Sequence, residues 1–257
     1  EFDGEQEVWE LYNVAEDFSQ SVDLAASHPD KLAELRALFE TEAVRYGVYP
    51  LRDASARRGG DYAPPHSMEG HSKMTYGPMH IRMPEHGVIN LKNTSYRITA
   101  TVMVQAGGQG VIACQGGNMA GWSLYLDEAS RPSYVYNWFG HEFTTLVGEP
   151  LAAGEHQICV EYAHDGGFAA GGDLELLVNG ERVAEGRVKR TVPVIFSMSG
   201  ETFDVGRDTG SPVGKYPHDF AFVGVIHGVT LERLAEPSQE VKQQERKGAF
   251  KAGLSAQ

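Results

Sequence analysis

The feature that most constrains the fold of this chain is the stretch over residues 107–139, GGQGVIACQGGNMAGWSLYLDEASRPSYVYNWF. Short apolar runs at 111–114 and 122–126 alternate there with Gly-rich turns, and the run at 133–139 divides into two faces of alternate residues. A period of two in aromatic and β-branched segments bounded by turn residues predicts β-strands. A protein built on this stretch must bury one or both faces of a sheet.

The same pattern repeats from residue 93 to residue 235, which predicts one mainly β sandwich. Its clearest local signal is Asn179-Gly180 between two alternating runs, because Asn-Gly favours the tight turn of a β-hairpin. The segment that follows, 236–257, is charged and has few apolar residues. We expect that tail to be a solvated helix or an arm.

Residues 1–50 do not share this pattern. Residues 8–14 suit a strand, and residues 27–30, Ser-His-Pro-Asp, have the capping hydroxyl, early Pro and first-turn acid of a helix start. Apolar residues then recur at helical spacing as far as Gly47. One strand and one helix bury too little surface to form a domain, so we expect this unit to pack on another body.

Residues 51–92 show little periodicity and contain His66, His71, His80 and His86. A metal site is one interpretation, and an extended linker lying along another body is the other. The spacing places no two of these histidines on one face of a helix or strand, and no carboxylate cluster accompanies them. A long segment without regular structure is usually functional or a linker, and we favour the linker.

Charge and composition exclude several partners. The chain has 22 Lys+Arg against 35 Asp+Glu, a formal net charge of −13, so no basic face is evident for nucleic acid or an anionic membrane. It shows no apolar run of about 18 residues and no signal-peptide pattern. Cys114 and Cys159 lie in apolar runs, and we expect buried free thiols. Low cysteine use favours the cytoplasm, with the periplasm as the alternative, and homo-oligomerisation stays open.

Three segments resemble the concanavalin A/laminin G class of jelly-roll sandwiches. They are the VNGERVAEG hairpin, the GWSLYL strand after a Gly turn, and the closing FDVG…FAFVGVIHGVTLE pattern. The resemblance implies a jelly-roll sandwich over residues 93–235, and it implies little about function.

The opening of the chain is similar to a signature of a different kind. WELYNVAEDFSQSVDLA resembles a segment near the end of formylglycine-dependent sulfatases, where this strand belongs to a small C-terminal sheet and the next helix packs on that sheet. Asn13, Phe18 and Asp23 depart from the signature. Bacterial arylsulfatases continue with further segments that occur here in the same order: YGVYPLRD, GWSLYL, VYNWFG, TVP and FDVGRDTGSPV. The resemblance spans about residues 5–235 and implies the C-terminal portion of a bacterial arylsulfatase.

In that family the catalytic machinery lies in the larger N-terminal region. A formylglycine made from the Cys of a Cys-x-Pro-x-Arg motif acts there with a calcium ion. Neither Cys114-Gln-Gly-Gly nor Cys159-Val-Glu-Tyr is that motif, so no catalytic, cofactor-binding or metal residue is assigned to this chain. The resemblance implies part of a sulfuric ester hydrolase that is inactive alone, binds the N-terminal catalytic region and helps to shape substrate access.

Two patterns in the sandwich suggest binding sites of their own. Tyr134, Tyr136 and Trp138 share one strand face, which would suit sugar stacking in a carbohydrate-binding, lectin-like module, although core packing explains the same residues. This module is the alternative function.

The second pattern is Asp204, Asp208 and Ser211, whose hard oxygens would suit calcium. We favour instead a turn in which Asp and Ser side chains cap their own backbone.

Overall fold

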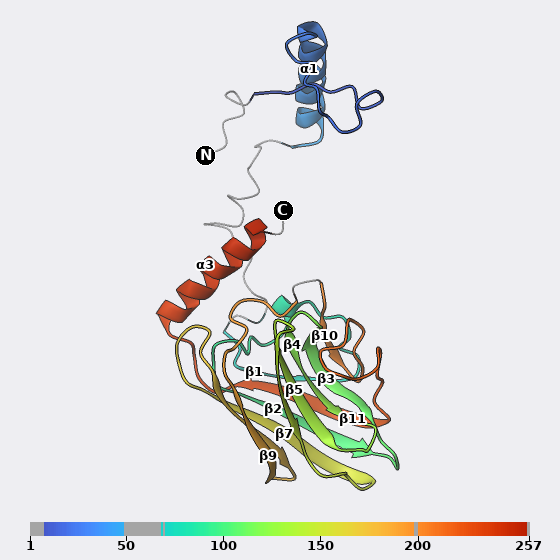
Figure 1. Cartoon of the computed structure of the whole chain (residues 1–257), viewed down its shortest axis with the longest axis vertical. Helices are drawn as coiled ribbons and strands as arrows, with labels where there is room; N and C mark the ends of the chain where they lie inside the picture. The colour runs from blue at the N-terminus through green and yellow to red at the C-terminus, as the bar shows by residue number, and fades with distance from the viewer. Residues whose placement is uncertain (1–7, 49–67, 69, 198–199, 256–257) are drawn as a thin grey trace. The chain divides into compact units, whose positions relative to one another are not determined.

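The computed structural model describes residues 8–48, 68, 70–197 and 200–255, the last seven of them by backbone alone. The chain divides into two compact units, Glu1–Ala63 and Pro64–Gln257, which Figure 1 shows in a colour gradient along the chain. Each unit is described by itself. No helix in the described ranges has the length and apolar character needed to cross a membrane.

The second unit is a sandwich of two antiparallel sheets (Figure 1). The six-stranded sheet has the order β1-β11-β2-β7-β8-β9, and the five-stranded sheet has the order β10-β3-β4-β5-β6. Their strands are β1 (Lys73–Tyr76), β2 (Tyr96–Val104), β3 (Gly110–Gly116), β4 (Gly121–Leu126), β5 (Pro132–Trp138), β6 (Glu142–Val147), β7 (Gly154–His164), β8 (Gly172–Val178), β9 (Glu181–Val188), β10 (Phe203–Val205) and β11 (Gly224–Arg233). The prediction of a mainly β, jelly-roll-type sandwich is confirmed.

The main core lies between the two sheets. Alternate residues of β2 are buried, as expected for a strand with one face toward the core and one toward solvent. Trp122 is fully buried and lies with its ring centroid 6.2 Å from that of Phe203 on the edge strand β10. The hydroxyls of Tyr96 and Tyr134 meet at 2.8 Å across the sheets, so these two buried hydroxyls satisfy each other.

A second, smaller core covers the outer face of the five-stranded sheet. The loop from β10 to β11, residues 206–223, folds back over β3, β4 and β5. Its apolar contacts are Val111, Cys114, Tyr125 and Val135 from the sheet, with Val213, Tyr216 and Phe220 from the loop. Strands β3 and β4 are therefore buried at every residue. This cover explains why the apolar run in that part of the sequence is nearly continuous.

The described part of the expected linker, within residues 51–92, contributes to the sandwich. Strand β1 pairs with β11 in antiparallel register, and Met83 forms an isolated bridge with Phe203 at the edge of the other sheet. Tyr76, Ile89 and other apolar side chains of this segment enter the core, because their burial stabilises an otherwise irregular run. The sandwich therefore begins before residue 93, while residues 49–67 lie outside the described part.

The described residues also include two α-helices and a short 3-10 helix, η1 (Glu85–Gly87). Helix α1 (Pro29–Arg45) forms where the helical spacing predicts it. Residues 8–13 form no strand and residue 14 already belongs to a turn, since no strand within residues 8–48 pairs with this segment. Helix α3 (Gln239–Ser255) occupies the charged tail. The sequence predicts a solvated helix or an arm here. Val241 is only 5% exposed, so one face of the helix is packed against the protein.

Candidate functional sites

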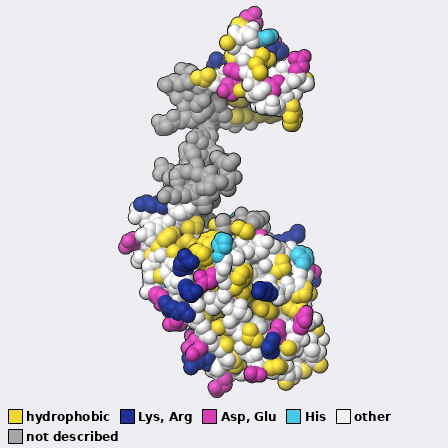
Figure 2. Space-filling view, viewed as in Figure 1, with side chains coloured by type: hydrophobic (Ala, Val, Ile, Leu, Met, Phe, Trp, Pro, Cys, Tyr) yellow, Lys and Arg dark blue, Asp and Glu magenta, His cyan; other side chains and the backbone are white. Residues whose placement is uncertain are grey.

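The N-terminal unit buries almost nothing within itself. Between residues 8 and 48 only Ala43 is buried. The unit's large exposed apolar side chains are Val8, Val14, Phe18, Val22, Leu35, Leu38, Val44, Tyr46 and Val48. Residues 8–48 also include eight acidic side chains and three basic ones. Figure 2 shows apolar and acidic groups side by side on the visible face. Such a surface suits an apolar partner face with a basic rim.

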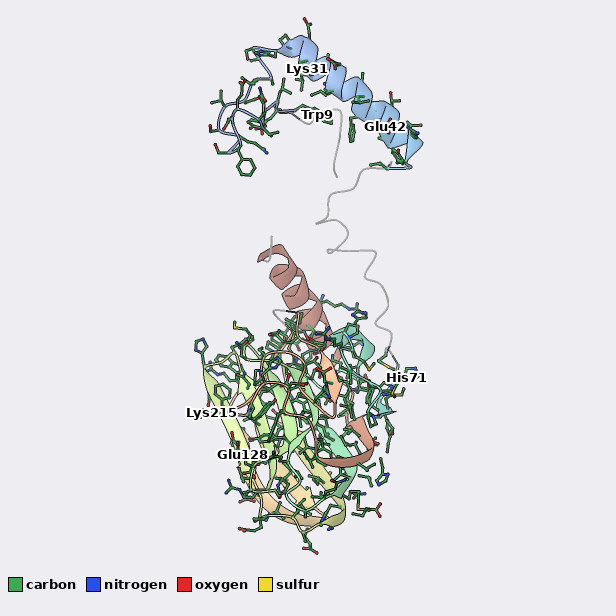
Figure 3. All side chains as sticks on the ribbon, turned by 90° about the vertical axis from the view of Figure 1, so that its right-hand side faces the viewer. Trp9, Lys31, Glu42, His71, Glu128 and Lys215 are labelled. Carbon is green, nitrogen blue, oxygen red and sulfur yellow. The ribbon has the colours of Figure 1, made fainter. Side chains whose placement is uncertain are left out.

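Trp9 holds the extended segment against helix α1. Its ring meets Phe39 edge to face with centroids 5.4 Å apart, and the Arg36 guanidinium lies 5.4 Å from the ring centroid. Figure 3 shows Trp9 beside the helix, at a level between Lys31 and Glu42. On the flank of this contact, Leu35 and Leu38 stay 39% and 55% exposed. The helix therefore presents an apolar strip that stays exposed beside the rest of residues 8–48.

The extended segment at residues 8–12 has one paired edge and one open edge. The Leu24 N–H donates to the Leu11 carbonyl at 2.7 Å, and the Leu11 N–H donates to the Asp23 carboxylate at 2.9 Å. Backbone groups of alternate residues in an extended chain point to opposite sides. Those of Glu10 and Tyr12 thus face the other edge, where they make no hydrogen bond to the described part of the chain. An open edge of this kind can add to a sheet of a partner.

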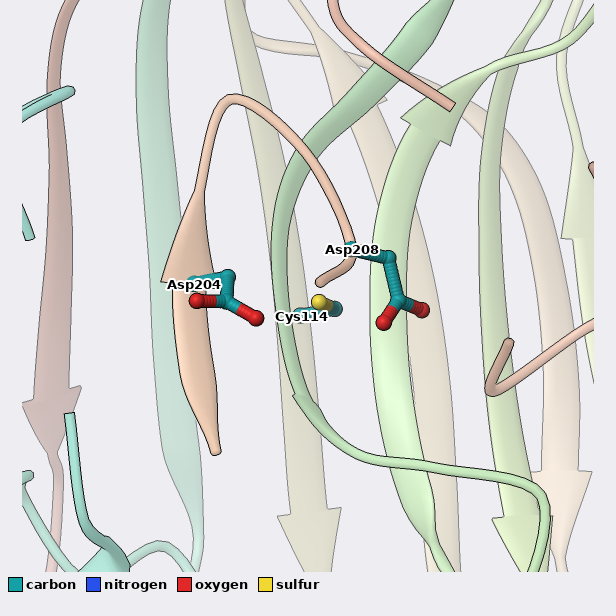
Figure 4. A group of neighbouring side chains, drawn as sticks. All are labelled: Cys114, Asp204 and Asp208. Carbon is teal, nitrogen blue, oxygen red and sulfur yellow. The ribbon is translucent and has the colours of Figure 1, made fainter. Parts of the chain in front are cut away.

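In the sandwich, the structure brings Asp204 and Asp208 of the proposed calcium site together, and the third residue, Ser211, bonds to other side chains. One carboxylate oxygen of Asp204, one of Asp208 and the Cys114 sulfur lie within 4.8 Å of one another, and Figure 4 shows the sulfur between the two carboxylates. Ser211 bonds elsewhere, since its hydroxyl donates to the side-chain oxygens of Asn118 and Glu201.

Both carboxylates are already occupied by hydrogen-bond donors from the chain. Asp204 accepts from the Arg82 N–H at 2.5 Å and from the Thr209 hydroxyl at 2.8 Å. Asp208 accepts from the Tyr216 hydroxyl at 2.7 Å and from the backbone N–H groups of Gly210 and Val213. A cation here would have to displace these donors. The arrangement matches the expected turn, in which aspartates cap the loop that covers the sheet.

Burial dominates the electrostatics of this cluster. It raises the pKa of the Asp208 carboxyl, against the hydrogen bonds from Tyr216 and the loop backbone, which lower it. It also raises the pKa of the Cys114 thiol well above its ordinary value, and the nearby Asp208 and Asp204 add to the increase. A buried thiol of raised pKa is a poor nucleophile, so Cys114 has the properties of a core residue.

The proposed sugar-stacking face is not available on the surface. Tyr134 and Tyr136 are 0% and 2% exposed and belong to the main core, because alternate residues of β5 point between the sheets. Their hydroxyls are also used, since Tyr136 accepts a hydrogen bond from the Val192 N–H at 2.8 Å. Trp138, at the end of β5, is only partly buried. The Arg190 guanidinium covers it at 3.8 Å from the ring centroid.

The histidines do not meet as a metal site among the described residues. His66 lies outside the described part of the chain. His80 accepts a hydrogen bond from the Gly77 N–H through Nδ1 at 2.9 Å, which fixes its ring in a tight turn. His71 and His86 are exposed. In the described ranges, the only group with metal-ligand spacing is the cluster of Cys114 and the two aspartates.

Sequence reasoning missed the residue that ties the loops together at one end of the sandwich. The Asn137 side chain is fully buried and donates to the carbonyls of Gly117 and Asn118, each at 3.0 Å. It accepts from the Gly140 N–H at 2.8 Å. The only available signal was a polar residue in an otherwise aromatic strand, VYNWF. The contact of Trp138 with Arg190 gave no sequence signal, since the two lie far apart along the chain.

Comparison with known proteins shows likeness of fold only. No family model matches the chain, and no curated protein matches it. Solved structures that resemble it include the CBM40 module of Ruminococcus gnavus IT-sialidase bound to α2,3-sialyllactose, at 16% identity and a TM-score of 0.42, covering 60% of this chain and 83% of that chain. They also include a leech intramolecular trans-sialidase, at 15% identity and a TM-score of 0.40, covering 59% of this chain and 23% of that chain.

Domains LG4-5 of the mouse laminin α1 chain are a third example, at 14% identity and a TM-score of 0.36, covering 64% of this chain and 40% of that chain. At identities and TM-scores this low, the likeness carries no argument about ligands or activity.

Proposed function

We propose that this chain is the C-terminal part of a formylglycine-dependent arylsulfatase, and that residues 8–48 dock on the catalytic region of that enzyme. The docked segment would complete a small sheet of the catalytic domain, and the sandwich would help to shape access of the sulfate ester. In this proposal the chain contributes no catalytic residue, and the activity, hydrolysis of sulfuric esters, belongs to the assembled protein.

The observation that carries this proposal is made on residues 8–48, of which one is buried while nine large apolar side chains are exposed. A full-sized apolar side chain gains about 1.5–3 kcal/mol when it is buried, so this surface is a strong driving force for association. The open edge at Glu10 and Tyr12 adds unpaired backbone groups that a strand of a partner would satisfy. Support from the sequence is the ordered set of arylsulfatase-like segments from residue 9 to residue 213.

In this proposal the chemistry and the docking lie in different parts of the enzyme. Formylglycine and calcium would be held by the catalytic region, where they would supply the nucleophile and charge stabilisation. The residues of this chain would bury apolar surface and extend a sheet. The buried aspartates of the sandwich, Asp204 and Asp208, already have hydrogen-bond donors and play no part in the proposed reaction.

Substitution on helix α1 tests the proposed docking. The partner is the catalytic region of an arylsulfatase that carries the same ordered segments, with its own C-terminal region removed. Leu38→Asp should weaken binding to that region by about tenfold or more, because it removes part of an apolar contact and places a charge in it. Ala37→Asp is the matched control, since it adds the same charge about 100° around the same helix. Equal binding by the two variants would refute docking through this strip.

A second candidate function, the carbohydrate-binding module, is favoured by one observation on the sandwich. Trp138 and Arg190 lie together at the loop end of β5, where an aromatic ring and a cation meet the surface. The two tyrosines of the same strand face are excluded from this role by burial. A glycan array probed with the whole chain tests the candidate, and an array without any bound glycan would eliminate it.

A further inference from the structure

We infer that Arg190 and Trp138 form a binding site for an oxyanion, a carboxylate or a sulfate, carried by a saccharide. The inference specifies the ligand of the second candidate function, carbohydrate binding. It rests on that function only in assuming that the anionic group belongs to a saccharide. It is independent of docking by the N-terminal unit.

The Arg190 guanidinium is held in place by stacking, and its one ion pair within the described part of the chain, with Glu142, is long. It lies 3.8 Å from the centroid of the Trp138 ring, whereas the guanidinium of Arg36 lies 5.4 Å from the ring of Trp9. Its side chain is 57% exposed, and its nearest carboxylate, Glu142, is 3.8 Å away. That separation is longer than a direct hydrogen bond, so the ion pair is weak, although Arg190 does contribute to the lowered pKa of Glu142. An arginine that stacks on a ring and keeps most of its N–H groups available is suited to bidentate binding of an oxyanion.

Both partners stand on rigid parts of the sandwich. Trp138 ends strand β5 and packs against the main core. Just after Arg190, the Thr191 N–H and hydroxyl both donate to the Ala170 carbonyl, and the Val192 N–H donates to the Tyr136 hydroxyl. The backbone that carries Arg190 is thus fixed on a buried anchor. A preorganised site loses little conformational entropy when its ligand binds.

The local charge favours an anion although the whole chain is acidic. Glu142 is paired with Lys189 at 2.7 Å, and the hydrogen bond from Lys189 is the main reason that the pKa of Glu142 lies below its ordinary value. Glu142 is thus ionised at neutral pH and its charge is matched by Lys189. Arg190 contributes one further positive charge at this end of the sandwich. Because the chain has a net charge of −13, a long polyanion would be repelled elsewhere, which favours a short saccharide.

Calorimetric titration of the whole chain with three saccharides tests the inference. The unsulfated chondroitin disaccharide presents a carboxylate, the 4-sulfated chondroitin disaccharide adds a sulfate, and N-acetyllactosamine has neither. We expect one or both anionic disaccharides to bind, and the neutral one to bind at least about tenfold more weakly. The ratio between the two anionic ligands tells whether carboxylate or sulfate is the preferred group.

Substitutions of Arg190 test whether this residue binds the anion or only stabilises the fold. Arg190→Gln should weaken binding of the anionic disaccharide by about tenfold to a hundredfold, since hydrogen bonds to charged groups are among the stronger ones. Arg190→Lys should restore only part of it, because the planar fork is lost. Arg182→Gln is the matched control, as Arg182 is 54% exposed and ion-paired on β9, and it should bind like the wild type.

Three outcomes would overturn the inference. Binding of the anionic disaccharides that survives Arg190→Gln unchanged would place the anion elsewhere. Equal binding of the neutral and anionic saccharides would refute an oxyanion site and leave the carbohydrate-binding function intact. Absence of binding by all three saccharides, together with an empty glycan array, would remove the site and that function together.

Discussion

Replacement of Asn137 by Ala should destabilise the sandwich by about 3–5 kcal/mol. The side chain is fully buried and lies where three segments meet: the β3–β4 turn, the β5–β6 turn and the loop that covers the five-stranded sheet. Its amide nitrogen donates to the carbonyls of Gly117 and Asn118, with the Val213 carbonyl at 3.4 Å. Its oxygen accepts from the Gly140 N–H. Alanine keeps the strand and removes all of these bonds.

The magnitude follows from counting the groups that would lose a partner. The two amide hydrogens can fully satisfy two carbonyls, and the oxygen satisfies one N–H, so three bonds are lost. A buried polar group left without a partner costs about 1–3 kcal/mol. Three such groups would together cost about 3–9 kcal/mol. Some of them are only partly buried, so water can reach them, and we therefore expect a total of about 3–5 kcal/mol. The loss would still be a large share of the roughly 5–15 kcal/mol that stabilises a domain.

Urea unfolding of the whole chain, followed by far-ultraviolet circular dichroism, measures this change in the free energy of unfolding. Asn118→Ala is the matched control, because its exposed side chain bonds only to the Ser211 hydroxyl and should cost less than about 1 kcal/mol. The dependence of the unfolding free energy on urea should be the same for both variants. If Asn137→Ala cost no more than the control, the idea that one buried amide closes this end of the sandwich would be wrong.

Three further predictions concern buried groups of the sandwich. Glu85 is largely buried, which raises its pKa, but Lys92 and backbone hydrogen bonds outweigh this and hold the pKa below the ordinary 4.5. Its contribution to stability is thus present above that pH and lost as the pH falls below it, so acid unfolding of Glu85→Gln should show a flatter pH profile than the wild type. Tyr216→Phe should cost about 1–3 kcal/mol in urea unfolding, because Asp208 loses its hydroxyl donor while it stays buried, and an unchanged midpoint would argue against the capping role. Cys114 should not react with Ellman's reagent until the protein unfolds, because it is fully buried and its thiol pKa is raised; rapid labelling of the native protein would show that the covering loop opens.

The sheet-forming part of this structure was predictable because its signals are local. Alternation in the run at 133–139 and the Asn179-Gly180 turn predict the strands and hairpin that are found. The covering loop was not predictable, because nothing in residues 206–223 indicates which sheet face they will cover. The strand expected at residues 8–14 does not form, since strand pairing depends on a neighbour, and a sequence pattern alone does not supply one.

The candidate sites also differ in whether they depend on local or on long-range interactions. The pattern of Asp208 and Ser211 predicted a turn capped by its own side chains. Asp208 does cap the backbone N–H groups of Gly210 and Val213, whereas the Ser211 hydroxyl bonds to the side chains of Asn118 and Glu201. The face of Tyr134, Tyr136 and Trp138 could be read from alternation, but which side of the sheet would be buried depends on the second sheet. Arg190 reaches Trp138 from a distant part of the chain, so only the folded structure reveals that pair.

Docking of residues 8–48 can be measured by sedimentation of this chain mixed with a sulfatase catalytic region that lacks its own C-terminal part. We expect a stable one-to-one complex that hydrolyses an aryl sulfate, while this chain alone is inactive. The complex should be lost with Leu38→Asp and kept with Ala37→Asp. Two species that sediment separately, with the N-terminal unit still exposing its apolar side chains, would contradict the claim.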